Sequence, residues 1–218
     1  MAYKVLSMNE KYTSPEETLT EIKHLMERSS RFISLSGFSG IFAGVYALLG
    51  ALAAWFYLKF VFHPAGRGAY ESSGADEQNL LVFLMLDAIL VLILAVSTGI
   101  FLTTRKAKKD GNSLLDAAAK KLIINLSIPL VTGGVFCLAL IYHGDTVYVA
   151  PAMLIFYGLA LVHASKYTRD DIRSLGIAEI VLGLVALVIV GYGLLFWAMG
   201  FGVMHILYGA YMYNKYEK

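Results

Sequence analysis

The stretch that decides the fold is residues 175–214, LGIAEIVLGLVALVIVGYGLLFWAMGFGVMHILYGAYMYN, which contains no lysine or arginine in 40 residues. A helix rises 1.5 Å per residue, so about 20 apolar residues already cross the roughly 30 Å hydrocarbon core of a bilayer. The stretch is therefore twice as long as one span needs. We expect it to fold back as two membrane helices, 175–193 and 197–214, with the turn in the glycine-rich region from Gly191 to Gly202.

Four more apolar stretches precede this one, so the sequence predicts an all-α integral membrane protein with six transmembrane helices. The four stretches cover residues 37–58, 79–103, 122–142 and 147–165. The 218-residue chain is 58% hydrophobic and 16% charged, whereas a soluble domain is roughly 45–50% apolar and about 25% charged. Only Asp87 and Glu179, among all its charged residues, fall inside a predicted span. Charge at bilayer depth is costly, so a membrane location explains this distribution.

The distribution of lysine and arginine predicts that both termini are cytoplasmic, because positive charge concentrates in the cytoplasmic loops of membrane proteins. Sixteen of the eighteen basic residues lie before the first span, in the second and fourth loops, or at the C-terminus. Only Lys59 and Arg67 lie on the other side. The compact chain shows no organellar targeting signal. We therefore expect it in the inner membrane of a bacterium.

The chain divides into a cytoplasmic N-terminal segment, residues 1–35, and a six-helix transmembrane domain, residues 36–218. Within the segment, residues 14–30 begin with a serine suited to cap a helix and a proline suited to its first turn. Apolar residues then recur on one face. The pattern predicts a short amphipathic helix that lies on the lipid headgroups or against the bundle.

Two of the predicted spans share a glycine pattern. The sequence GFSGIFAG at 37–44 matches GIAEIVLG at 176–183 at both ends and at the isoleucine, and the dipeptide Tyr-Gly occurs at both 157–158 and 208–209. One interpretation is three tandem helical hairpins; the other is that small residues simply allow close helix packing. The glycine-spaced hairpin at 175–214 resembles the bacterial acid-resistance membrane proteins of the HdeD type over about 40 residues. This likeness implies a six-span fold and assigns no function.

Four ionisable side chains at bilayer depth form a candidate intramembrane polar site: Asp87, His163, Glu179 and His205. Counting residues from the predicted helix ends places Asp87 and His205 near the midplane. The same count places Glu179 and His163 together, nearer the cytoplasmic surface. An ionisable group in a membrane indicates function by default, and the alternative is a structural hydrogen bond between helices.

Three classes of function remain open. We favour a non-catalytic membrane protein, a transporter-like or stress-associated module that uses its acidic and histidine groups for protons, ions or packing. The second class is an intramembrane metal-dependent hydrolase with His163, Glu179 and His205 as ligands, since zinc binds three such ligands and a water. The third is a haem-binding electron carrier with paired axial histidines, His63 with His143 and His163 with His205.

Motifs of soluble catalysts and of nucleic-acid binding are missing from the sequence. It contains no phosphate-binding glycine loop, nucleophile elbow or His-Glu-x-x-His motif, so we assign no catalytic residue, cofactor or metal. The net charge of +2 provides no basic field for nucleic acid. The lipid bilayer is the expected partner, and a second copy of the chain is another, through a glycine-lined helix face at Gly40, Gly44 and Gly50.

Reporter fusions test the predicted topology. A topology reporter fused after Lys109 should report the cytoplasm, and one fused after Ser73 should report the opposite side, because one predicted span separates the two points. A same-side result would rule out this arrangement of spans.

Overall fold

The computed structural model describes residue 19 and residues 36–62, 74–109 and 117–218, and these contain helices and no strand. The predicted all-α class with six helices is confirmed for this part of the chain. The predicted segment 1–35, with its amphipathic helix at 14–30, lies outside the described residues apart from Leu19. Four of the six helices are single α-helical elements or are extended at one end only: α2 Gly37–Phe56, followed by the π-helical η1 Tyr57–Phe62, α3 Gly74–Lys109, α4 Ala117–His143 and α6 Asp171–Val188. The fifth is α5 Val149–Ala164, with a short 3-10 helix at each end, η2 Thr146–Tyr148 and η3 Ser165–Tyr167. The last helix consists of α7 Gly193–Trp197, the π-helical η4 Ala198–Met204 and α8 His205–Tyr216.

Five of the six helices are long and apolar enough to cross a membrane, as expected for a membrane protein. The exception is α6, which carries three charged residues, Asp171, Arg173 and Glu179, within its 18 residues. Two of these lie in its first turn, and the third lies in its middle. The helix that departs from the apolar pattern is therefore also the one that carries a predicted site residue.

The chain turns back between α6 and α7, as the long apolar stretch predicts. The turn lies at residues 189–192, earlier than the predicted 194–196. Gly191 has a φ of +96°, a left-handed conformation that glycine adopts without the steric cost of a side chain. Gly200 and Gly202, which the sequence also offered as turn residues, instead lie in the π-helical segment η4.

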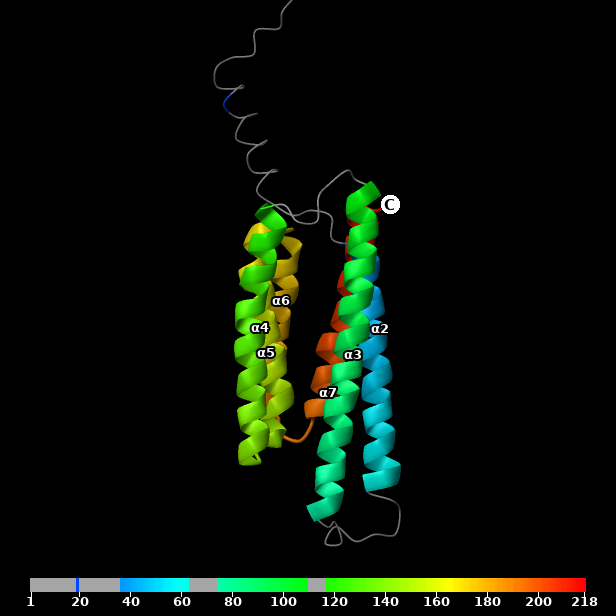
Figure 1. The fold of residues 1–218 in the computed structure, drawn as a ribbon, viewed down its shortest axis with the longest axis vertical. Helices are drawn as coiled ribbons and strands as arrows, with labels where there is room; N and C mark the ends of the chain where they lie inside the picture. The colour runs from blue at the N-terminus through cyan, green and yellow to red at the C-terminus, as the bar shows by residue number, and fades with distance from the viewer. Residues whose placement is uncertain (1–18, 20–35, 63–73, 110–116) are drawn as a thin grey trace, which may run out of the picture.

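The helices form two sets that run along a common axis (Figure 1). In one set α5 packs between α4 and α6, and in the other α2 packs between α3 and α8. The connection after α6 leads from the first set to the second, and η4 contacts both α6 and α2. The segment α7–η4 is therefore where the two sets meet.

The start of α2, the end of α3 and the end of α8 are joined by one carboxylate. Glu217 accepts a hydrogen bond from the backbone N–H of Gly37 at 2.6 Å and one from Lys106 Nζ at 2.9 Å. A carboxylate at a helix start also interacts favourably with the positive end of the helix dipole. The beginning of the first described helix and the C-terminus therefore lie at the same end of the bundle.

The repeated glycine pattern occurs at two similar helix crossings, one between α5 and α6 and the other between α2 and the η4–α8 segment. A Cβ placed on Gly183 of α6 would lie 2.9 Å from Pro151 O of α5, and one placed on Gly44 of α2 would lie 2.5 Å from Gly202 O of η4. In both crossings the Cβ position also lies 2.7 Å from the Cγ1 atom of an isoleucine, Ile155 or Ile206. Two further pairs correspond in the same way, Gly176 with Gly158 and Gly37 with Gly209. Close backbone approach between helices of one chain therefore explains these glycines.

The three glycines predicted to line a self-association face also point inward. Gly40 lies against Gly209, Gly44 against η4, and Gly50 against Val91 and Asp87 of α3. These contacts are made within one chain, and self-association stays a prediction.

Alanine substitution at the two equivalent glycines tests the crossing. Gly44→Ala and Gly183→Ala should each destabilise the folded protein by about 1–3 kcal/mol, because the added methyl would meet backbone atoms that cannot move aside cheaply. Gly134→Ala in α4 is the matched control, since nothing lies within 4 Å of its Cβ position, and alanine is favoured there by about 1 kcal/mol. Unfolding in mild detergent measures all three, and equal stability of the first two and the control would contradict the repeated crossing.

Candidate functional site

The centre of the candidate site is Glu179, the ninth residue of α6. Its side chain is fully buried, and neither carboxylate oxygen has a hydrogen-bond partner among the described residues. Oε2 packs so closely on Gly200 that a Cβ there would collide with it and with Leu154. A charged carboxylate without water or donors costs several kcal/mol, so the neutral, protonated form is the cheaper one here.

His205 lies beside Glu179 and connects it to two other groups. Its Nδ1 lies 3.0 Å from Gly200 O and 3.5 Å from Glu179 Oε1, and its Nε2 lies 2.6 Å from the hydroxyl of Tyr157. A carbonyl oxygen only accepts hydrogen bonds, so Nδ1 carries a proton. In a neutral ring Nε2 is then the acceptor, and Tyr157 donates to it.

The local helix geometry explains how His205 reaches a carbonyl of its own helix. Gly200 lies five residues before His205, within the π-helical segment that ends at Met204. Side chains of a helix tilt toward its N-terminus, so the imidazole lies over the preceding turn. Single π-helical turns within α-helices are frequently found at functional sites. The glycine at 200 also leaves the space that the Glu179 carboxylate occupies.

Each of the two helix crossings contributes one of these polar residues and has an apolar residue or glycine at the position of the other. When Gly183 is matched to Gly44 and Ile155 to Ile206, Glu179 matches Gly40 and His205 matches Leu154. The same backbone crossing therefore forms with glycine in place of the glutamate. Packing alone does not account for Glu179.

The other two predicted residues lie elsewhere. Asp87 of α3 is half-buried and faces α2, where a Cβ on Gly50 would lie 3.1 Å from its Oδ2. His163 is half-buried in the last turn of α5. The structure thus brings together Glu179 and His205, which the depth count had assigned to different levels.

The depth count failed because the helices extend beyond their apolar cores. Glu179 is the fifth residue of the predicted span 175–193, but α6 begins at Asp171 and makes it the ninth. His205 is the first of the 12 residues of α8, so it lies at a similar distance from the same end of the bundle. Polar first and last turns still belong to a helix, and apolar run length alone does not include them.

Tyr157 and the carbonyl of Gly200 are site groups that the sequence reasoning missed. Tyrosine is common near the ends of membrane helices, where it lies at the interface, and this hid the central position of Tyr157. The repeated Tyr-Gly dipeptide at 157–158 and 208–209 was a usable signal. A backbone carbonyl leaves no such signal in a sequence.

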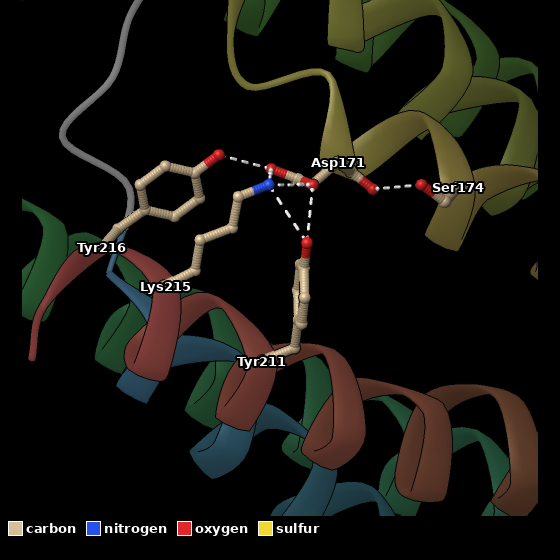
Figure 2. Close-up of polar contacts among 5 residues, drawn as sticks. All are labelled: Asp171, Ser174, Tyr211, Lys215 and Tyr216. Carbon is tan, nitrogen blue, oxygen red and sulfur yellow. Dashed lines mark hydrogen bonds and ion pairs between the residues drawn. The ribbon is translucent and has the colours of Figure 1, made fainter.

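A second polar cluster joins α6 to α8 at the end of the bundle that carries the C-terminus. Asp171 accepts hydrogen bonds from Lys215 at 2.9 Å and 3.1 Å, from Tyr216 at 2.6 Å and from Tyr211 at 3.3 Å (Figure 2). The guanidinium of Arg169 lies 3.5 Å from the centre of the Tyr216 ring. Partial burial alone would raise the pKa of Asp171, but the hydrogen bonds from Lys215 and the tyrosines outweigh it and lower that pKa.

The structure offers little to the two alternative functions. In the described part of the chain, no three His, Cys, Asp or Glu side chains gather closely enough to hold a metal ion together. His163, Glu179 and His205 therefore do not form the ligand set of the hydrolase alternative. For the haem alternative, His63 lies outside the described residues, and both ring nitrogens of His205 already have partners.

Comparisons of the chain with protein-family models, with curated proteins and with solved structures found no match. The fold and the site define a helical membrane protein with a buried acid–imidazole–phenol centre. Its function is therefore argued from that centre alone.

The pH dependence of stability tests the Asp171 cluster. Asp171→Asn should lower stability at neutral pH by up to about 1 kcal/mol, the range of a partly exposed ion pair. Because the pKa of folded Asp171 is lowered, its stabilisation is present above the unfolded value of ~3.9 and is lost as the pH falls through the folded value. The melting temperatures of variant and wild type should therefore converge in acid.

Asp145→Asn, at the opposite end of the bundle, is the control and should not show this convergence. A difference between Asp171→Asn and wild type that stays constant from neutral to acid pH would show that the carboxylate charge is not what holds α6 to α8.

Proposed function

We propose that this chain is a small, non-catalytic, transporter-like protein of the bacterial inner membrane, in which Glu179, His205 and Tyr157 form a proton-binding centre. In this proposal all six helices cross the membrane and both termini are cytoplasmic. The excess of lysine and arginine on one side supports the orientation. The meeting of the start of α2 with the C-terminus at one end of the bundle supports it as well.

The observation that carries the proposal is the fully buried Glu179 carboxyl without a hydrogen-bond partner. A helix that only had to pack would not retain such a group, and the equivalent crossing uses Gly40 at this position. Polar groups retained at bilayer depth mark proton relays, ion paths or ligand sites. The carboxyl and Leu154 both pack closely on Gly200, so a proton is the cargo that fits without rearranging the helices.

The three side chains can pass a proton with atoms and charges balanced. As Tyr157 gives its hydroxyl proton to His205 Nε2, the ring releases its Nδ1 proton to Glu179 Oε1, 3.5 Å away. Starting from the deprotonated form of Glu179, the transfer leaves the ring as its Nε2–H tautomer, turns the carboxylate into a carboxylic acid and leaves Tyr157 as a phenolate, which takes up the next proton. Histidine suits this role because its two nitrogens can exchange the roles of donor and acceptor.

The repeated crossing supports three tandem hairpins as the architecture. If the hairpins are α2–α3, α4–α5 and α6–α8, each crossing joins the second helix of one hairpin to the first helix of another: α5 to α6, and α8 to α2. The matching glycine contacts occur at these two places. The centre then lies between the two helices of the third hairpin, with Tyr157 supplied by the second.

Infrared spectroscopy of the purified protein tests the proton centre. A protonated carboxyl group has a C=O stretching band that a carboxylate lacks, and wild type should show this band at neutral pH. Glu179→Gln should abolish it while changing stability by only about 1 kcal/mol, the scale of one interhelical hydrogen bond, because glutamine has the same size. Asp145→Asn, an exposed control, should leave the band unchanged. A wild-type protein without the band, or a band that survives Glu179→Gln, would contradict the proposal.

A further inference from the structure

Tyr208 is a buried polar group that the proton centre does not use. It lies three residues after His205 in α8, and its buried hydroxyl has no hydrogen-bond partner among the described residues. Buried hydroxyl groups are normally hydrogen-bonded, so an unpartnered one needs a reason. Its ring packs on the same group of buried residues as Tyr157, namely Leu161, Ile172 and Leu175.

Asp171 lies beyond Tyr208, toward the end of the bundle. Its side chain is 19% exposed, so water reaches it, and it accepts a hydrogen bond from Tyr211, which lies three residues after Tyr208 in α8. Asp171 lies eight residues before Glu179 in α6, which places it roughly 12 Å nearer the end of the bundle. Tyr208 is displaced from His205 toward the same end by roughly 4.5 Å. The polar groups thus follow one another from the surface to Glu179.

The opposite side of the centre is apolar. Beyond Glu179, toward the other end of the bundle, Ala186 of α6 forms a buried cluster with Leu154 and Phe196, against which Leu182 and Phe201 also pack. Apolar side chains therefore pack beyond Glu179 on this side, whereas Tyr157, Tyr208 and the partly exposed Asp171 lie on the other.

We infer that Tyr208 and Asp171 form a one-sided proton path between the Glu179 centre and the water at the C-terminal end of the bundle. The inference rests on the proposed proton-binding function and adds the route and the side of access. Under the proposed orientation, protons enter from the cytoplasm.

The steps balance. Asp171 takes a proton from water and passes it to the Tyr208 oxygen, and the Tyr208 hydroxyl proton moves to the Tyr157 oxygen, directly or through one water. Tyr157 then protonates His205 Nε2 as Nδ1 protonates Glu179. At the end Asp171 is a carboxylate again, both tyrosines are neutral, and one proton has moved to Glu179.

The test follows the infrared band of the Glu179 carboxyl after a pH jump applied to one side of vesicles that hold the protein in a single orientation. The band should respond quickly when the jump is made on the side of the C-terminus and slowly when it is made on the other side. A positioned acid–base group accelerates proton transfer by roughly 10²–10⁴-fold, so Tyr208→Phe and Asp171→Asn should each slow the fast response by about tenfold or more. Tyr213→Phe, which removes a hydroxyl from the face of α8 that packs on Phe38 of α2, is the matched control and should not slow it.

The outcomes separate this inference from the proposed function. If Glu179→Gln removes the band but Tyr208→Phe and Asp171→Asn respond as fast as wild type, the proton centre stands and the path is wrong. A faster response to the jump made on the opposite side would overturn the path as well. If wild type shows no band that depends on Glu179, the centre and the path both fail.

Discussion

A carboxyl group removed from water must be neutralised, and this constraint explains most of the features around Glu179. Lipid supplies neither water nor hydrogen-bond donors, so charge is cleared from almost every span. One glutamate, Glu179, remains, and its surroundings accommodate it: Gly200 leaves room for the carboxyl, and a ring nitrogen of His205 lies 3.5 Å from it. The buried acid is costly to the fold, and its retention is the strongest argument for a function.

The repeated helix crossing turns this argument into an internal comparison. The two crossings share their glycines and isoleucines, so the backbone requirements of the fold are met in both. They differ in two residues: Glu179 occurs in the α5–α6 crossing, where the other has Gly40, and His205 occurs in the α2–α8 crossing, where the other has Leu154. The glycines and isoleucines common to both crossings are explained by packing, whereas Glu179 and His205, each present in one crossing alone, are not. The two crossings of one chain thus distinguish residues needed for packing from residues of the site.

The sequence predicted the fold better than it predicted the site. Long runs free of Lys and Arg identified six helices, because the cost of charge in lipid leaves a strong signal in composition. The same signal placed the start of α6 too late, because its first turn carries Asp171 and Arg173 and is still helical. Pairing Asp87 with His205 by depth did not account for which helices are neighbours, and a π-helical turn such as η4 has no sequence pattern that would reveal it. The carbonyl of Gly200 could be recognised as a site group only from coordinates.

The central claim is that Glu179 and His205 share a proton within a neutral centre, and the tautomer of His205 tests it most directly. Nitrogen-15 NMR of the ring in the membrane-embedded protein distinguishes protonation at Nδ1, at Nε2 or at both. The geometry predicts a neutral, singly protonated ring: the proton is on Nδ1, held by Gly200 O, while Nε2 accepts from Tyr157, and it is on Nε2 directly after a proton has passed to Glu179. A doubly protonated ring at neutral pH, unchanged in Glu179→Gln, would contradict the account.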